Sequence, residues 1–311
     1  MRPPADVRLL CHDVDMRVSI GDIRLYFDID GPKVVPYGPI MVERPTLVLL
    51  HGGPGADHST FKPAMYAAAR FAQVVYLDQR GSGRSERGDP ALWTWERWAD
   101  DVVAFCDVVD IPAPILVGTA SGGRVALTAA IRHPGRVGRL VLDSVLPGRV
   151  DERLDVFERL GGARVREIAR RHWQGERSDE IRRGWEQVCV PLYSRRADGD
   201  PDAVDRARRI RWNHDVGERF RYHLADHFEE WIGLDAVTCP TLVLAGEHDP
   251  VTTASAARRL AAGLVNAETR LHVLPDAGHG AFREAPERSL AVLRAFLSGR
   301  DGVSARAERG G

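Results

Sequence analysis

The chain has 311 residues, with 43 basic and 44 acidic side chains and a formal net charge of −1 at pH 7. This balance gives no overall field that would attract nucleic acid or an anionic membrane, so the expected partner is a small-molecule substrate. The length suits one core domain that carries a sizeable insertion.

The N-terminal segment begins Met1-Arg2-Pro3-Pro4-Ala5-Asp6 and holds no apolar stretch of the length that a signal peptide or a membrane span needs. We therefore expect a cytoplasmic protein with no membrane contact. The first regular element is a predicted hairpin, with strands at Met16–Ile20 and Ile23–Asp30 and a turn at Gly21-Asp22.

Short apolar runs follow, of the kind expected for strands buried on both faces of a parallel sheet. They are Thr46–Leu50, Val74–Leu77, Pro114–Val117 and Arg139–Leu142. Helical periodicity appears in Trp95–Val109 and Gly122–His133, each of which lies between two of these runs, as a βαβ crossover requires. The pattern predicts an α/β fold with a doubly wound, mostly parallel sheet.

The pattern changes after Pro147-Gly148, where about 85 residues are rich in arginine and glutamate and carry apolar positions at helical spacing. Strand-like runs return at Thr241–Leu244 and Leu271–Leu274, and Ala285–Leu297 is the last predicted helix. We predict a core of residues 1–147 and 236–298, a helical cap of residues 148–235 and a flexible tail over residues 299–311. Either a monomer or a homodimer agrees with this organisation.

The strand at Ile115–Val117 runs through Gly118-Thr119-Ala120-Ser121-Gly122-Gly123 directly into a helix. This is the strand-turn-helix context of the nucleophile elbow G-x-S-x-G, in which only the central residue departs from the pattern. An elbow residue with positive φ costs roughly 1–2 kcal/mol, and a fold keeps such strain in order to present a nucleophile. Ala120 keeps the turn and lacks the hydroxyl.

Ala120 is therefore interpreted as a replacement of the serine nucleophile, either engineered or natural, and the chain as written is predicted to be inactive. A third alternative is that Thr119 or Ser121 acts instead. It is disfavoured, because neighbours in a tight turn point tens of degrees away from the apex, whereas nucleophile and base must meet within about 3 Å.

Upstream, the strand that ends at Leu50 leads into the loop His51-Gly52-Gly53-Pro54-Gly55. In the usual hydrolase arrangement this loop lies beside the elbow. The amides of Gly53 and Ser121 are then the predicted oxyanion hole.

Two further candidates follow the late strands. Asp249 lies in Gly246-Glu247-His248-Asp249-Pro250, and His279 lies in Gly278-His279-Gly280. The chain order of nucleophile, acid and base is that of α/β-hydrolases, and parallel sheets place their ligand sites past the carboxyl ends of the strands. His279 is predicted to be the general base and then the general acid, and Asp249 the residue that fixes its tautomer.

With these residues assembled, the chain resembles the proline iminopeptidase branch of the α/β-hydrolases, through His51-Gly52-Gly53-Pro54-Gly55 and the segment Asp78–Ser85, which reads Asp-Gln-Arg-Gly-Ser-Gly-Arg-Ser. The similarity covers Pro45–Leu146 and Thr238–Leu297 and is weak in the cap. We predict that Asp78–Ser85 is a loop brace, in which Arg80 and Ser85 bind backbone groups.

The resemblance implies cleavage of an N-terminal proline or another small residue from peptides, while close relatives hydrolyse esters, lactones and amides. An aminopeptidase needs carboxylates for the substrate's ammonium, and the candidates are Asp226, Glu229 and Glu230. The arginines of Arg164–Arg171 and Arg206–Arg211 would instead suit an anionic substrate.

Aromatic residues around the cap predict a mostly apolar pocket, although core packing explains them as well. They are Trp93, Trp95, Trp173, Trp185, Trp212 and Trp231. The predicted substrate-binding residues are Gly52, Trp212, Trp231 and Glu229.

Three functions share this fold. The first is a serine hydrolase without its nucleophile, the second a non-catalytic binding protein, and the third a cofactor-free lyase or cyclase that uses His279 as base. Retention of Asp249, His279 and the Gly52-Gly53 loop favours the hydrolase. No cofactor or metal is expected. Cys11, Cys106, Cys189 and Cys239 form no C-x-x-C pair, so neither a disulfide framework nor a zinc site is suggested.

Overall fold

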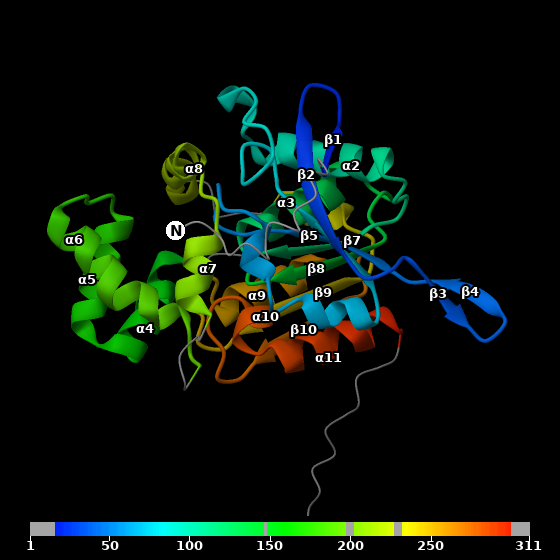
Figure 1. Ribbon diagram of the computed structural model, residues 1–311. Coiled ribbons are helices and arrows are strands. Elements are labelled where there is room, and N and C mark those ends of the chain that lie inside the picture. The colour runs from blue at the N-terminus through cyan, green and yellow to red at the C-terminus, as the bar shows by residue number, and fades with distance from the viewer. Residues whose placement is uncertain (1–15, 146–147, 197–201, 227–231, 300–311) are drawn as a thin grey trace, which may run out of the picture.

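An eight-stranded sheet runs through the molecule in the order β1-β2-β6-β5-β7-β8-β9-β10 (Figure 1). The computed structural model describes residues 16–145, 148–196, 202–226 and 232–299. Strands from β6 to β10 are parallel, and β1 and β2 are antiparallel additions at one edge. The strands are β1 Arg17–Ser19, β2 Arg24–Asp30, β5 Thr46–Leu50, β6 Gln73–Leu77, β7 Ile115–Thr119, β8 Arg139–Asp143, β9 Thr241–Gly246 and β10 Thr269–Leu274. The predicted doubly wound sheet is confirmed.

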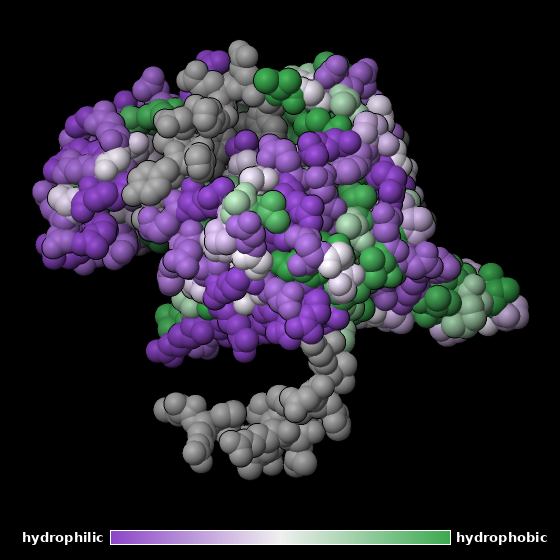
Figure 2. Space-filling view, turned by 90° about the horizontal axis from the view of Figure 1, so that it is seen from above, coloured by the Kyte–Doolittle hydropathy of each residue, from purple (hydrophilic) through white to green (hydrophobic). Residues whose placement is uncertain are grey.

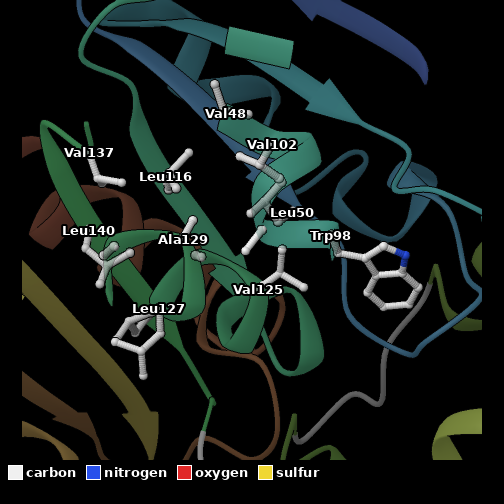
Figure 3. Packing of buried hydrophobic residues seen from close by; sticks show 14 of the residues in the cluster. Val48, Leu50, Trp98, Val102, Leu116, Val125, Leu127, Ala129, Val137 and Leu140 are labelled. Atoms are coloured by element: carbon white, nitrogen blue, oxygen red, sulfur yellow. The ribbon is translucent and has the colours of Figure 1, made fainter. Parts of the chain in front are cut away.

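Both faces of the sheet are buried. Successive residues of one strand point to opposite faces, and each face packs in its own apolar cluster. Val48 and Leu50 of β5 pack against helices α2 (Trp95–Val108), α3 (Ser121–Arg132) and α9 (Ala254–Gly263), as Figure 3 shows in part. Leu47 and Leu49 pack on the other face, with α10 (Ala281–Glu284) and α11 (Pro286–Leu297). Burial of each such side chain contributes about 1.5–3 kcal/mol, which fixes the strand ends that carry the site.

A second hairpin was not predicted. Strands β3 (Val34–Tyr37) and β4 (Ile40–Glu43) pair only with each other and project from the body of the molecule (Figures 1 and 2). Tyr37 is 76% exposed and Met41 63% exposed, so the hairpin lacks the alternation of buried and exposed residues that marks a strand in a sequence.

Between β8 and β9 the chain forms the helical insertion. Its helices are α4 (Val150–Gly161), α5 (Ala163–Trp173), α6 (Asp179–Gly184), α7 (Ala203–Arg209) and α8 (His214–Asp226). The first of these enclose a small apolar cluster of their own, which includes Phe157, Ile168 and Ile181 and is separate from the clusters on the sheet. Within the described ranges, no helix has the length and apolarity to cross a bilayer.

Candidate active site

Ala120 occupies the sharp turn between β7 and α3. Its φ is 51° and its ψ is −119°, so the turn has the strained backbone of a nucleophile elbow. Gly122 permits the close approach of the turn to β5, because a Cβ built on Gly122 would lie 2.0 Å from the carbonyl oxygen of Leu50. The amide of Ala120 donates to the carbonyl of Asp143 at 2.9 Å, which fixes the turn to β8. A methyl group therefore stands at the apex.

His279 and Asp249 are brought together by the loops after β9 and β10. Nδ1 of His279 lies 2.8 Å from Oδ2 of Asp249. Oδ1 of Asp249 accepts from the amides of Val251 and Thr252 at 2.8 and 2.9 Å, and the Thr252 hydroxyl donates to Oδ2. Sequence reasoning did not identify Thr252; its only signal was its place three residues after Asp249.

The carboxyl of Asp249 is completely buried. Burial alone would raise its pKa, but the charge of His279 and the hydrogen bonds from His279 and Thr252 outweigh burial, and the pKa lies below its usual value. An ionised Asp249 keeps the proton of His279 on Nδ1. Nε2 of His279 has no hydrogen-bond partner among the described residues, so it is available for proton transfer.

The loop after β5 lies against the elbow. A Cβ on Gly52 would be 3.1 Å from the Cβ of Ala120, and one on Gly53 would be 3.1 Å from Cη2 of Trp212. The amide of Ser121 is the first of helix α3, where no intrahelical acceptor exists. Neither this amide nor that of Gly53 donates to another residue in the described part of the chain. Two free donors therefore flank the elbow.

A cavity of about 250 Å³ joins these features. Ala120 and His279 line it, with Gly52, Gly53 and Trp212. Its remaining lining is mostly apolar, from Ala56, Phe61, Ala64, Met65, Ile210 and Phe282. Its volume suits a small molecule of roughly ten to fifteen non-hydrogen atoms.

Asp143 also lines this cavity, at the end of β8 and next to the elbow strand. It accepts from the amide of Ala281 at 2.8 Å and from the hydroxyls of Thr119 and Ser144, each at 3.1 Å. Burial raises the pKa of Asp143, and these donors offset only part of the effect. The Thr119 hydroxyl is thus engaged by a carboxyl group. The sequence analysis did not identify Asp143. The available signal was an acidic residue at the end of a buried strand.

The segment Asp78–Ser85 does brace the loops, but not entirely as predicted. The Ser85 hydroxyl binds backbone groups, accepting from the amide of Tyr26 at 2.8 Å and donating to the carbonyl of Asp78 at 2.6 Å. The prediction was wrong for Arg80, whose guanidinium binds two carboxylates instead.

Arg80 is fully buried and donates twice to Asp101 of α2, at 2.6 and 2.8 Å, and to Asp22 at 2.8 and 3.0 Å. A guanidinium has five donors in a rigid fork, more than one carbonyl can satisfy, which favours carboxylates as its partners.

Asp57, His58 and Asp78 approach one another closely enough to hold a metal ion. Their acceptors are already used, however. Asp78 accepts from the His58 ring and from the amides of His58 and Arg84, each at 2.8 Å, and Asp57 accepts from the Arg84 guanidinium at 2.8 Å and the Arg211 amide at 3.2 Å. The cluster therefore fits a hydrogen-bonded brace between loops and does not fit a cation site.

Some predicted residues do not line the cavity. Trp93 and Trp95 are buried in the core at the start of α2, and Trp173 and Trp185 pack in the cluster of the insertion. For these four, the core-packing alternative holds. Trp231, Glu229 and Glu230 lie outside the described residues, as does the side chain of Asp226.

Residues 45–286, well over half of the chain, match the family model described as alpha/beta hydrolase fold. The chain belongs to the α/β-hydrolase family. It is 30% identical to the "Putative carbamate hydrolase RutD" of Caulobacter sp. (strain K31) over 284 residues, 87% of this chain and 97% of the relative. It is 26% identical to the 2-hydroxymuconate semialdehyde hydrolase of Pseudomonas putida, over 82% and 88% of the two chains.

Among solved structures, a proline iminopeptidase-related protein from Thermus thermophilus superposes with a TM-score of 0.68 at 23% identity, covering 91% of this chain and 96% of that one. Likeness at this identity shows the fold alone. By sequence, the relatives of this α/β-hydrolase also include a proline iminopeptidase of Lactobacillus helveticus, 25% identical over 83% of this chain and 92% of the relative. The comparisons therefore do not single out the iminopeptidase branch from the putative carbamate hydrolase and the semialdehyde hydrolase.

Proposed function

We propose that this protein has the site of an acyl-transfer hydrolase for a small, mostly apolar ester, lactone or N-terminal aminoacyl amide, and that Ala120 makes the chain as written inactive. The observation that carries the proposal is that the His279–Asp249 pair opens onto the cavity that Ala120 and Gly53 also line. General base, oxyanion donors and acyl position are then all supplied, and only the attacking oxygen is missing.

The role of each residue follows. His279 would take the proton of a nucleophile and return it to the leaving group, Asp249 would stabilise the imidazolium, and the amides of Gly53 and Ser121 would hold the oxyanion. Thr119 is a poor substitute nucleophile, since its hydroxyl donates to Asp143. The relatives include a putative carbamate hydrolase and a 2-hydroxymuconate semialdehyde hydrolase, so assays with esters, lactones and aminoacyl amides identify the bond that is cleaved.

Replacement of Ala120 by serine tests the proposal. We expect Ala120→Ser to gain reaction with a fluorophosphonate probe and to hydrolyse short-chain aryl esters with a kcat raised by about 10⁶. The control is Ala120→Ser combined with His279→Gln, which should lose the gain. If Ala120→Ser neither labels nor hydrolyses any such ester, the hydrolase proposal fails.

A second candidate, a non-catalytic binding protein, is favoured by Ala120 itself. On the hydrolase proposal, the Ala120 protein and Ala120→Ser should bind the true substrate equally within about tenfold, because the hydroxyl acts through the covalent bond and not through ground-state contacts. Substantial affinity of the Ala120 protein, together with no gain of activity in Ala120→Ser, would favour the binding protein.

A further inference from the structure

The projecting hairpin β3–β4 concentrates exposed apolar side chains. Of the fourteen large apolar side chains that are exposed in the described ranges, five lie within nine residues of this hairpin: Val34, Tyr37, Ile40, Met41 and Val42. Figure 2 shows apolar residues gathered on the part of the molecule that projects from its body. At these exposures the five side chains present roughly 500 Å² of apolar surface to water, a size at which a patch on a monomer commonly has a binding role.

The β4 side of the hairpin is an open backbone edge. The amide of Arg44 donates to the carbonyl of Lys33 at 2.7 Å, and hydrogen-bonded pairs alternate with non-bonded pairs along an antiparallel ladder. Met41 faces Pro36 in a non-bonded pair, so the amide and carbonyl of Met41 point away from β3. Those of Glu43 point the same way, and among the described residues none of these four groups has a backbone partner.

The β3 side of the hairpin is blocked by proline. Pro36 occupies an outward-pointing position of β3 and has no amide hydrogen, so an added strand could not form a regular ladder there. The two amides and two carbonyls of Met41 and Glu43 are, in contrast, the arrangement that pairs with an added strand. A two-stranded hairpin alone is marginally stable in water, and further strands stabilise it.

The open edge is complementary to itself. When two copies of β4 lie antiparallel, Met41 of each copy can face Glu43 of the other, and every outward amide and carbonyl then takes part in one of four backbone hydrogen bonds. The two-fold axis passes between the two Val42 residues, and such an axis is the commonest symmetry of homo-oligomers. The apolar side chains alone supply more than half of the roughly 800 Å² that each partner buries in a standard interface.

We propose that β4 pairs with β4 of a second copy of this chain, so that the two hairpins form one four-stranded antiparallel sheet in a homodimer. The hairpin projects from the body of the molecule (Figure 1), which leaves its edge accessible to the second copy. None of its residues lines the cavity at Ala120. The proposal therefore does not depend on the proposed hydrolase function.

Sedimentation velocity at micromolar concentration tests the proposal. We expect a species of twice the chain mass of 34.4 kDa. Met41→Pro removes an outward amide of β4 without removing a bond inside the hairpin and should give a monomer, whereas the matched control Val34→Pro removes an outward amide from the blocked edge and should leave the dimer intact. A monomeric parent protein, or the same mass for both variants, would overturn the proposal.

Disulfide trapping gives a second test that needs no proline. Val42→Cys places two cysteines at the two-fold axis with Cα atoms about 4.5 Å apart, within the range of a disulfide, so mild oxidation should cross-link two chains through residue 42. The control Ile40→Cys should not cross-link, because its two copies lie about four residues apart along the paired strands, on the order of 13 Å. Peptide mapping identifies the bond, and equal cross-linking of the two variants, or none in Val42→Cys, would contradict the pairing.

A lipid surface is the alternative occupant of the hairpin. Flotation with phosphatidylcholine vesicles distinguishes it from a second copy, because the dimer buries the apolar side chains and should remain unbound. Vesicle binding by a monomeric protein, with loss of this binding in Tyr37→Ser, would assign the hairpin to a membrane and overturn the dimer.

Discussion

At the scale of single residues, the site contains two buried carboxyl groups with opposite pKa shifts. The pKa of Asp249 is lowered, whereas the pKa of Asp143 is raised. Burial raises the pKa of both carboxyls and the charge of His279 lowers both, so the difference arises from the hydrogen bonds, which for Asp249 come from His279 and Thr252. This assigns Asp249, and not Asp143, as the residue able to stabilise an imidazolium.

The shifts predict opposite pH dependences of stability. Because the folded pKa of Asp143 is raised, its contribution to stability is present below the unfolded pKa, about 3.9, and is lost as the pH rises through the folded pKa. Asp143→Asn cannot ionise and keeps an oxygen for the Ala281 amide. Its stability should therefore improve relative to the parent as the pH rises above about 4, as urea unfolding measures.

Asp249→Asn is the matched comparison. Its parent carboxyl has a lowered pKa, so the stabilisation is present above the unfolded pKa and lost as the pH falls through the folded one. The loss of unfolding free energy in Asp249→Asn, relative to the parent, should then be largest at neutral pH and become smaller at acidic pH. The same direction of change in both variants would contradict the assignment of the two shifts.

At the scale of elements, buried ion pairs connect the loops that carry the site to the helices behind them. Arg80 anchors the loop after β6 to Asp101 of α2. Asn213 anchors the start of α8 to the same loop, donating from Nδ2 to the carbonyl of Gly81 at 2.8 Å. The Gln79 side chain of this loop donates to the carbonyl of His51 at 2.9 Å, which joins these contacts to the loop that carries Gly52 and Gly53.

Removal of the Arg80 guanidinium should be costly. Arg80→Met leaves the carboxyl of Asp101 buried beside Arg97 at 3.1 Å and without its two hydrogen bonds from Arg80, and we expect a loss of about 3–5 kcal/mol in unfolding free energy. Arg132→Met breaks an exposed pair between α3 and Asp100 of α2 and should cost less than about 1 kcal/mol. Chemical denaturation compares them, and similar losses would show that burial of the Arg80 pair is unimportant.

At the scale of the whole molecule, the insertion and the core meet directly at His279. The amide of His279 donates to the carbonyl of Tyr193 at 2.7 Å, and Oε2 of Glu284 accepts from the amides of Gly278 and Arg195 at 3.2 and 2.6 Å. Since Tyr193 and Arg195 belong to the insertion, a movement of this segment would displace the loop that carries the base.

The separate apolar cluster of the insertion predicts separate local stability. Amides of β5, β7 and β8 should exchange hydrogen only on global unfolding, whereas those of α5 and α6 should exchange at least about a hundredfold faster. Hydrogen-exchange mass spectrometry measures both in one experiment. Uniform protection of core and insertion would contradict the prediction.

The sequence by itself determined the parts of this protein that depend on local order along the chain. Buried strands are visible as apolar runs, and residues that follow such strands must gather at one edge of a parallel sheet. Ala120, Asp249 and His279 each follow one of these strands, so their meeting could be predicted. The projecting hairpin β3–β4 could not be predicted, because neither strand has a buried face that would give its sequence an alternating pattern.

Only the tertiary structure decided which side chains from unrelated segments share the cavity. Arg206 and Trp212 reach it because the insertion folds over the Gly52-Gly53 loop, and Arg283 reaches it from α10. In the sequence these arginines are two among many, and exposed helix faces account for most of the others. The sequence specifies which residues carry a charge and of which sign. Proximity and desolvation set the strength of an electrostatic interaction, and both exist only once the fold has formed.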